Sequence, residues 1–166
     1  MQLNVGFFQS PLGTMQIEAS ESVLVSVKFL SEEKSERPNQ SGGSDIIAKT
    51  INQLTAYFAG DLTKFDLPIV FTGTEFQEQV WSEVLKIPYG STATYGQIAE
   101  RIGAREMARA VGSANGDNPL WIIVPCHRVI GSQGELTGYA GGLWRKQWLL
   151  EHEGYQQLLP WKTNKG

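Results

Sequence analysis

The chain changes its pattern at Thr72-Gly73-Thr74, where short strand-like runs give way to helix-like ones. Runs of strands followed by runs of helices favour two separately folded parts over a single alternating sheet. We therefore expect an α/β scaffold domain over residues 1–73, with a small antiparallel sheet and a helix, and a mostly α domain over residues 74–166. A chain of 166 residues with 41% hydrophobic residues can supply the cores that this requires.

The first domain should be an antiparallel meander followed by a helix. Asp45 is a plausible N-cap for this helix, whose apolar residues recur at helical spacing up to Phe58. No catalytic cluster occurs in this half, so a scaffold role is favoured. β-branched or alternating runs predict strands over residues 5–10, 15–19, 23–29 and 67–71. A polar, glycine-rich run predicts a mobile loop over residues 31–44.

The second domain should be helical. Thr74 with Gln77 forms a capping-box pattern that opens a helix through Leu85. A short helix over 94–102, a turn at Gly103 and a second helix over 105–115 give a helix-turn-helix outline, although many such hairpins bind nothing. A last helix is predicted over 143–153, with Gly154 after it and a frayed tail from residue 156.

The only cysteine, Cys126, stands directly before His127, one of two histidines. The thiolate is the nucleophilic form of cysteine, and an imidazole can take the thiol proton when a third group orients the ring. An unpaired cysteine is often just a buried apolar residue. Here, however, polar and basic residues follow it, and residues 131–142 include five glycines, which is typical of a site loop.

Charge and composition exclude several classes of protein. One cysteine and two histidines cannot form a thiolate-rich zinc site, so no metal or other cofactor is expected. No apolar run is long enough to span a membrane, the first residues carry no basic leader pattern, and a reactive lone cysteine indicates a reducing, cytoplasmic setting. The net charge is −3, but residues 76–166 carry nine basic and eight acidic side chains, so any DNA contact should come from there.

The cysteine lies in the motif Pro125-Cys126-His127-Arg128-Val129, and further motifs flank it in order: Ile87-Pro88-Tyr89-Gly90, Thr94-Tyr95-Gly96-Gln97-Ile98-Ala99, Ala108-Arg109-Ala110-Val111-Gly112, Asn118-Pro119, Gly138-Tyr139-Ala140-Gly141-Gly142-Leu143 and Trp148-Leu149-Leu150. Together they resemble the O6-alkylguanine-DNA alkyltransferases, or methylated-DNA–protein-cysteine methyltransferases, of the bacterial single-chain type without a fused zinc domain. The resemblance is dense from about residue 76 to 154 and thin before that.

This resemblance implies stoichiometric DNA repair. Cys126 would take the alkyl group from O6 of guanine, or from O4 of thymine if that lesion is also a substrate. The alkyl group would stay on sulfur as a thioether, because a thioether is a poor leaving group. His127 would draw the thiol proton through a water, and Glu153 would orient the imidazole. The damaged nucleotide would be flipped out of double-stranded DNA. We expect a monomer that needs no cofactor.

The resemblance also implies two sets of contact residues. Arg109 would fill the place of the flipped nucleotide, while the other small residues of its helix would approach the minor groove. Substrate-binding roles are implied for Tyr95, Val129, Tyr139, Ala140 and Asn118. DNA-binding roles are implied for Arg109, Tyr95, Ala110, Gly112, Ser113, Ala114 and Arg128.

Some readings from the residues alone remain open. Tyr95 and Tyr139 could be packed aromatics, and Asp117 would oppose a phosphate if it faced DNA. The protein could also be a lesion sensor without chemistry, or a cysteine hydrolase. Glu153 is expected at a helix C-terminus, where a carboxylate is mildly unfavourable, so Glu153→Gln should change stability little or raise it slightly.

Overall fold

The structure is a computed structural model that describes residues 2–31 and 44–155. The chain forms two compact units: residues 1–72 with 119–121, and residues 73–118 with 122–166. The sequence predicts no such excursion of residues 119–121 into the first unit. Most of the predicted loop over 31–44, and the predicted tail from residue 156, lie outside the described residues.

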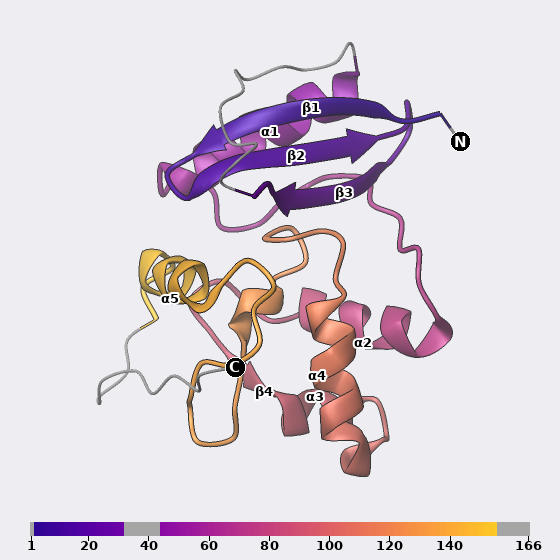
Figure 1. Ribbon diagram of the computed structural model, residues 1–166, viewed down its shortest axis with the longest axis vertical. Coiled ribbons are helices and arrows are strands. Elements are labelled where there is room, and N and C mark those ends of the chain that lie inside the picture. The colour runs from indigo at the N-terminus through magenta and orange to yellow at the C-terminus, as the bar shows by residue number, and fades with distance from the viewer. Residues whose placement is uncertain (1, 32–43, 156–166) are drawn as a thin grey trace. The chain divides into compact units, whose positions relative to one another are not determined.

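The first unit is a three-stranded antiparallel sheet in the order β1-β2-β3 (Figure 1), formed by β1 (Asn4–Ser10), β2 (Gly13–Ala19) and β3 (Leu24–Phe29). This confirms the predicted meander. The range predicted as a further strand, 67–71, makes only one isolated bridge, in which Ile69 pairs with Leu24. Residues 119–121 join the free edge of β3, where the Val27 N–H donates to the Pro119 carbonyl at 2.9 Å.

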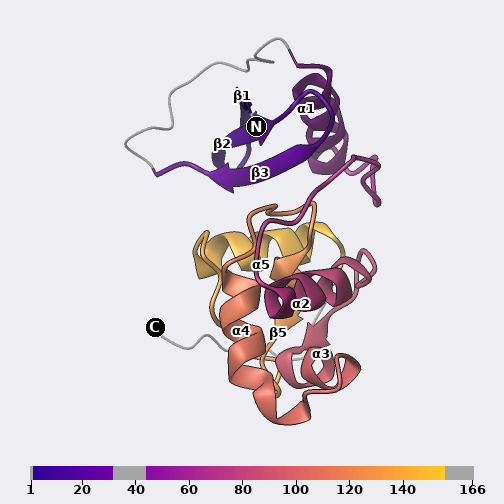
Figure 2. The ribbon, with the colours of Figure 1, turned by 90° about the vertical axis from the view of Figure 1, so that its right-hand side faces the viewer.

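Helix α1 (Asp45–Phe58) lies along one face of this sheet, as the rotated view shows (Figure 2). Its N-cap is Ser44 and not Asp45, because the Ser44 hydroxyl accepts from the Ile47 N–H at 3.5 Å. Asp45 is instead the first helical residue, where its carboxylate faces the positive end of the helix dipole. The core between helix and sheet is fully buried and includes Met15, Ile17, Leu24, Ile47, Leu54 and Tyr57.

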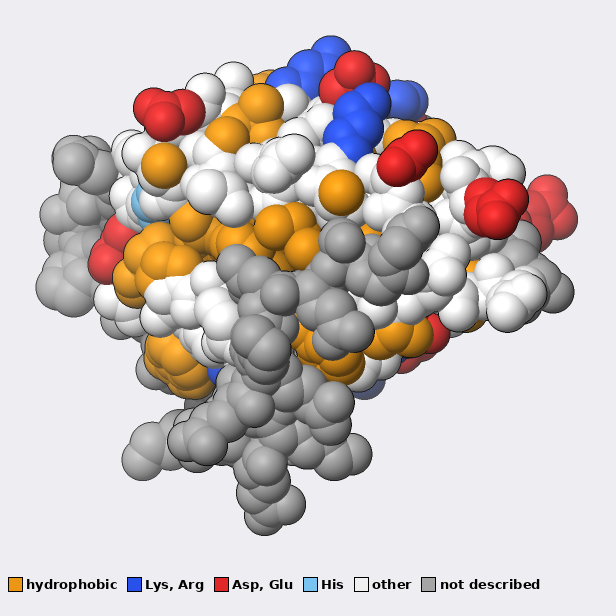
Figure 3. All heavy atoms as spheres, turned by 90° about the horizontal axis from the view of Figure 1, so that it is seen from above, with side chains coloured by type: hydrophobic (Ala, Val, Ile, Leu, Met, Phe, Trp, Pro, Cys, Tyr) orange, Lys and Arg blue, Asp and Glu red, His pale blue; other side chains and the backbone are white. Residues whose placement is uncertain are grey.

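One face of the molecule is seen from above in Figure 3, where hydrophobic side chains gather in a band between charged side chains at its margins. Leu3 and Val5 at the start of the sheet each leave 37% of their surface exposed. Partly exposed apolar residues are normal on a protein surface. No helix among the described residues is long and apolar enough to cross a membrane.

The second unit is mostly helical, as predicted, and contains α2 (Glu75–Leu85), α3 (Tyr95–Arg101), α4 (Ala108–Gly116) and α5 (Leu143–His152). The predicted capping box of Thr74 and Gln77 opens α2, and a second capping box, of Thr94 and Gln97, opens α3. The Trp81 indole anchors α2 to α4 by donating to the Ala114 carbonyl at 2.8 Å.

Two short elements connect these helices to the cysteine segment. Strand β4 (Ala93–Thr94) pairs in parallel with β5 (Val129–Ile130). Strand β5 directly follows a single 3-10 turn, η3 (Cys126–Arg128). A second 3-10 turn, η2 (Arg105–Met107), precedes α4, so the predicted helix over 105–115 begins with a tighter turn. Neither strand is predicted from the sequence, since two-residue strands have no periodicity to detect.

Candidate active site

Cys126 begins the η3 turn. Two buried asparagine side chains, one at the end of α4 and one directly after it, hold this turn in place. The Asn118 Nδ2 donates to the Val124 carbonyl at 2.9 Å, and the Cys126 N–H donates to the same carbonyl at 2.8 Å. The Asn115 Nδ2 donates to the Cys126 carbonyl at 3.2 Å. All these side chains are buried, so the backbone on both sides of Pro125 is fixed from one helix end.

The approach to this turn includes an unusual backbone conformation at Ile122, with φ of 72°. A β-branched residue is disfavoured in this left-handed region, and such strain persists only where the surroundings impose it. Ile122 is buried and follows residues 119–121, which are hydrogen-bonded to β3. The chain therefore turns sharply just before it presents the thiol.

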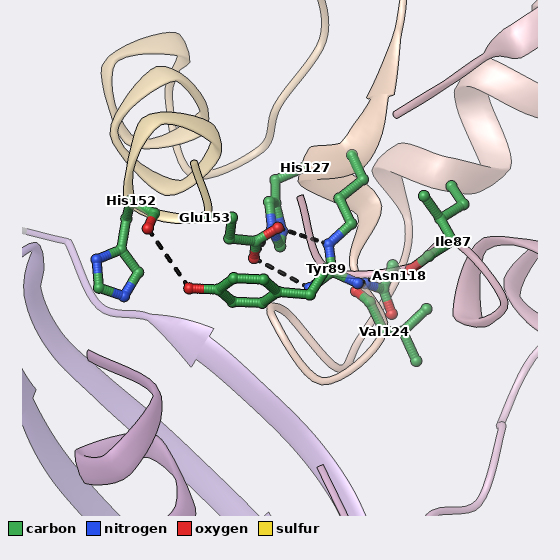
Figure 4. Close-up of polar contacts among 8 residues, drawn as sticks. Ile87, Tyr89, Asn118, Val124, His127, His152 and Glu153 are labelled. Carbon is green, nitrogen blue, oxygen red and sulfur yellow. Dashed lines mark hydrogen bonds and ion pairs between the residues drawn. The ribbon is translucent and has the colours of Figure 1, made fainter. Parts of the chain in front are cut away.

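His127 and Glu153 form the contact that the resemblance implied. The His127 Nε2 lies 2.8 Å from the Glu153 Oε2, and both side chains are inaccessible to solvent. The close-up shows the ring and the carboxylate turned toward each other (Figure 4). Because a carboxylate can only accept, the proton of a neutral imidazole must be on Nε2, and Nδ1 then carries the basic lone pair.

Charges around the pair define its protonation. Burial lowers the pKa of His127, the positive charges of Arg128 and Lys146 lower it further, and Glu153 acts in the opposite direction. Burial opposes ionisation of Glu153, but His127 and the Arg128 guanidinium outweigh burial and hold the pKa of this carboxyl far below its usual range. The site thus contains a neutral imidazole on an ionised carboxylate, with Nδ1 able to accept a proton.

Arg128 has a different place from the DNA-contacting one implied by the resemblance. Its guanidinium is buried and donates to both Glu153 carboxylate oxygens, at 2.7 and 3.1 Å, and to the Ile87 carbonyl at 2.6 Å. It also lies over the Tyr89 ring, whose hydroxyl donates to the His152 carbonyl (Figure 4). We therefore assign Arg128 to the support of Glu153.

This arrangement leads us to replace the expectation that Glu153→Gln would leave stability almost unchanged with the prediction of a large loss. Glu153 is the C-cap of α5, as its predicted position suggested, but only 4% of it is exposed and it neutralises a buried arginine. The helix-dipole effect that motivated the expectation is worth at most a few tenths to about 1 kcal/mol at a surface. Removing one partner of a buried ion pair costs several times more.

The thiol of Cys126 is buried, and burial raises its pKa, whereas a hydrogen bond from Asn118 and the positive charge of Lys146 act to lower it. The thiol is therefore protonated at neutral pH and needs a base before it can attack. A neutral His127 with a basic Nδ1 fits that need. Such an arrangement of thiol, imidazole and carboxylate supports alkylation of sulfur by an electrophilic carbon.

Lys146 is a site residue that the sequence analysis missed. It is fully buried on α5, and its Nζ donates to the Thr137 carbonyl at 2.7 Å. The Tyr95 hydroxyl donates to the same carbonyl at 3.1 Å, and the Nζ lies 5.8 Å from the Tyr95 ring centre. The signal was its spacing: Lys146 lies three residues after Leu143 and three before Leu149, on the apolar side of the helix.

Burial lowers the pKa of Lys146 to about 8, against an attraction to Cys126 that raises it. The unfolded chain keeps this proton up to about 10.5. The unfolded state therefore binds more protons between pH 8 and 10.5, and this residue makes stability rise with pH in that window. We expect Lys146→Met to remove this contribution, so that the difference in unfolding free energy between the two proteins changes with pH only there. Urea unfolding from pH 7 to 11 measures it; a constant difference would contradict the buried charge.

The loop over 131–142 has the backbone angles that its glycines suggested. Gly134, Gly138 and Gly142 have positive φ values of 80°, 57° and 95°. The loop brings Tyr139 into a buried position, where burial and Cys126 raise the pKa of its phenol well above the usual range, so its hydroxyl stays protonated. Ala140 is exposed and offers only backbone groups, while Val129 is buried in β5.

The residues of α4 implied as DNA contacts divide into three groups. Arg109 and Ser113 are exposed, Ala110 and Gly112 are half-buried, and Ala114 is buried with its carbonyl bound to Trp81. Ala114 therefore faces the interior of the second unit. Asp117 after the helix accepts from the Gln77 amide at 3.2 Å, so part of its charge is directed to α2.

Within the described ranges, no group of three or more His, Cys, Asp or Glu side chains is arranged to hold a metal ion. His152, the other histidine, stacks on Trp148 with ring centres 4.8 Å apart. The candidate site therefore consists of the Cys126 thiol and the network of His127, Glu153 and Arg128. It also includes Asn115 and Asn118, and Lys146 with the Thr137 carbonyl and Tyr95.

Comparison with known proteins matches nearly the whole chain. Residues 75–155 match the family described as "6-O-methylguanine DNA methyltransferase, DNA binding domain", and residues 3–71 match its "ribonuclease-like domain". The methylated-DNA–protein-cysteine methyltransferase of Mycobacterium tuberculosis is 49% identical over 87% of this chain and 88% of its own length. The one from Methanosarcina acetivorans is 48% identical over 89% and 96%.

Solved structures agree with these matches. The crystal structure of the Mycobacterium tuberculosis O6-methylguanine methyltransferase superposes with a TM-score of 0.81 at 46% identity, covering 92% of this chain and 93% of that chain. A crystal structure of the Mycobacterium tuberculosis protein in complex with DNA gives a TM-score of 0.80 at 48% identity, covering 89% and 90%.

Proposed function

Because the chain belongs to the 6-O-methylguanine DNA methyltransferase family, we propose that it repairs DNA by transferring an alkyl group from O6 of guanine to Cys126. The observation that carries the proposal is a buried thiol that directly precedes, in the chain, a neutral imidazole held by an ionised carboxylate. A structural cysteine would not need this network. Relatives that are methylated-DNA–protein-cysteine methyltransferases, at 48–49% identity, support the same activity.

In this reaction the thiol proton passes through a water to the Nδ1 of His127, and Glu153 stabilises the imidazolium. The sulfur then attacks the alkyl carbon, so that a carbon–sulfur bond forms as the carbon–O6 bond breaks. The electron pair of the broken bond stays on O6, and the restored guanine takes up one proton. Lys146 stabilises the negative charge on sulfur during deprotonation.

The product is a thioether, which is a poor leaving group. None of the site residues offers a second step that would return the thiol, so each protein molecule acts once. Tyr139 keeps its phenolic proton and can donate it toward O6 as that oxygen leaves. Tyr95 can donate to the guanine ring after releasing the Thr137 carbonyl, and Val129 offers its carbonyl to the exocyclic amine.

The base must leave the duplex to reach a buried sulfur. We assign DNA binding to α3, the turn at Gly103 and α4, acting as a helix-turn-helix, with Arg109 filling the place of the flipped nucleotide in the minor groove. A thiol that must stay reduced fits a cytoplasmic protein. O4-alkylthymine has the same alkyl–oxygen bond and is a second possible lesion for the same sulfur.

Arg109→Ala tests base flipping separately from chemistry. Arg109 is exposed on α4, and its loss should not alter the buried site. Extruding a base costs a few kcal/mol, and only the duplex reaction includes that step. We expect the rate of repair of an O6-methylguanine duplex to fall at least tenfold, while the rate of reaction with free O6-benzylguanine stays within about twofold. Equal losses with both substrates would assign Arg109 to the pocket or the fold.

The proposed function as a whole is tested by mixing the protein with a duplex that contains O6-methylguanine and measuring its intact and peptide masses. One methyl group per chain, on the peptide containing Cys126, is expected, with no further turnover when lesion is in excess. Binding of the lesion without methylation would instead assign the protein to lesion sensing. Repeated turnover would assign it to a different, hydrolytic class of cysteine chemistry.

A further inference from the structure

The motif Ile87-Pro88-Tyr89-Gly90 forms a turn that the proposed reaction does not use. It continues directly from α2, where the Ile87 N–H donates to the Val84 carbonyl at 3.0 Å. The proline ring fixes φ at Pro88, and Gly90 has a positive φ of 80°, a conformation that favours glycine. These four residues, named here the 87–90 turn, therefore leave α2 along a stiff and closely defined path.

Both ends of the 87–90 turn contact the residues that support the imidazole. At one end, the Ile87 carbonyl accepts from the Arg128 guanidinium at 2.6 Å, and the same guanidinium donates to both Glu153 carboxylate oxygens. At the other end, a Cβ added to Gly90 would lie 3.2 Å from the Glu153 backbone oxygen. The backbone of the turn therefore runs close against the end of α5 and is tied to the carboxylate through one guanidinium.

Tyr89 lies between these two contacts. Its ring centre is 5.8 Å from the central carbon of the Arg128 guanidinium, which is close enough for an aromatic face to attract a cation. Its hydroxyl donates to the His152 carbonyl at 3.4 Å, and Figure 4 shows the ring beside the Glu153 carboxylate. Burial raises the pKa of the Tyr89 phenol, and so does the negative charge of Glu153, as expected for a ring next to this ion pair.

The ring also lies at the boundary between the ion pair and solvent. The Glu153 side chain is inaccessible to solvent and the Arg128 side chain is 8% exposed, whereas Tyr89 is half-buried. The attraction between charges weakens as the surrounding dielectric constant rises, so water that reached the pair would weaken it. The same carboxylate charge stabilises the imidazolium of His127, and a hydrated, less constrained carboxylate would stabilise it less.

We propose that Tyr89 is a positioning residue, which holds the Arg128 guanidinium against the Glu153 carboxylate and keeps water from this pair. The proposal rests on the proposed function, in which Glu153 orients His127 and His127 takes the thiol proton. Without the ring, the imidazolium loses part of its stabilisation. The thiol then gives up its proton less readily, and Cys126 becomes reactive only at a higher pH.

The test compares the wild type with Tyr89→Leu and Tyr89→Phe. The rate of Cys126 alkylation by iodoacetamide is measured between about pH 5 and 10, which spans the usual pKa values of imidazole and thiol. In Tyr89→Leu we expect the rate at pH 7 to fall about fivefold, as for the loss of one cation–π contact. The rate should approach that of the wild type at high pH, where hydroxide removes the thiol proton instead.

Tyr89→Phe separates the ring from its hydroxyl. The hydrogen bond to the His152 carbonyl is long, so we expect the ring alone to keep the alkylation curve close to that of the wild type. The rate of methyl transfer from an O6-methylguanine duplex at pH 7 should fall in the same order, with Tyr89→Leu slowest. A Tyr89→Leu curve that coincides with the wild-type curve would overturn the proposal. A Tyr89→Phe curve displaced as far as the Tyr89→Leu curve would also overturn it.

Val80→Ala is the matched control for a purely structural effect. Val80 is fully buried in α2, two helical turns before the 87–90 turn, so its truncation should lower the free energy of unfolding and leave the alkylation curve in place. If Tyr89→Leu does not fold, Tyr89→Met replaces it, since it also removes the aromatic face.

The alkylation curves and the proposed function can fail separately. The charged groups that act on the thiol and the imidazole are Glu153, Arg128 and Lys146, and all three are retained in every one of these variants. A wild type that took no methyl group from DNA would contradict the proposed function. The reaction with iodoacetamide needs no DNA, so the curves would still decide whether Tyr89 positions the pair.

Discussion

Glu153→Gln is expected to lower the free energy of unfolding by about 3–5 kcal/mol, because it leaves the buried Arg128 guanidinium without its counter-charge. It should also slow methyl transfer at neutral pH. A glutamine amide can donate to His127 Nε2 and thereby move the imidazole proton to Nδ1, where the basic lone pair is needed. Urea denaturation measures the stability, and the pH dependence of Cys126 alkylation by iodoacetamide measures the reactivity of the thiol.

The same helix end provides a matched control, Glu151→Gln. Glu151 is exposed and accepts from the Gln147 amide, so its replacement removes one charge from the C-terminus of α5 without touching the buried network. We expect its unfolding free energy to stay within about 0.5 kcal/mol of the wild type, with an unchanged pH profile. If both variants behaved alike, Glu153 would have no special role in orienting His127.

Cys126→Ser is expected to abolish methyl transfer, with no methylated protein detectable by mass spectrometry even after prolonged incubation. The serine hydroxyl is far less acidic than the thiol, and a neutral imidazole cannot generate enough of its anion. Binding to a lesion-containing duplex should persist, because the exposed surface of α4 is unchanged. Fluorescence anisotropy with labelled DNA measures this binding.

A matched substitution tests whether loss of activity reflects the atom or its surroundings. Ser82→Ala alters a hydroxyl on the exposed side of α2 and leaves the η3 turn intact, so methyl transfer should remain. Methylated protein recovered from Cys126→Ser would rule out Cys126 as the acceptor. Loss of both DNA binding and transfer in that variant would instead indicate that the thiol supports the fold.

Local signals accounted for most of the fold that was predicted correctly. The capping box of Thr74 and Gln77 could be read because its two partners are three residues apart. The N-cap of α1 was displaced by one position, since Ser44 and Asp45 are both good cap residues and only the hydrogen bond to Ile47 distinguishes them. The pairing of β4 with β5 joins residues more than thirty positions apart and left no local trace.

The candidate site was predicted unevenly for the same reason. Cys126 and His127 were found because they are adjacent and rare, and the contact between His127 and Glu153 came only through the family resemblance. The DNA-contacting role of Arg128 came from the resemblance alone, and its buried contact with Glu153, 25 positions away, leaves no local signal in the sequence. Asn115 follows Val111 by four residues on the buried side of α4, a spacing that could have identified it.

The passage of residues 119–121 along β3 means that no single cut separates the protein into independent folds. A fragment beginning at Gly73 would take Leu120 and Trp121 away from the first unit and leave both apolar side chains without their burial there. The complementary fragment, residues 1–72, would lose the backbone partner of Val27 and keep an open sheet edge, which is prone to pairing with other chains. The connection that leads to the nucleophile thus also completes the sheet edge of the unit that carries no chemistry.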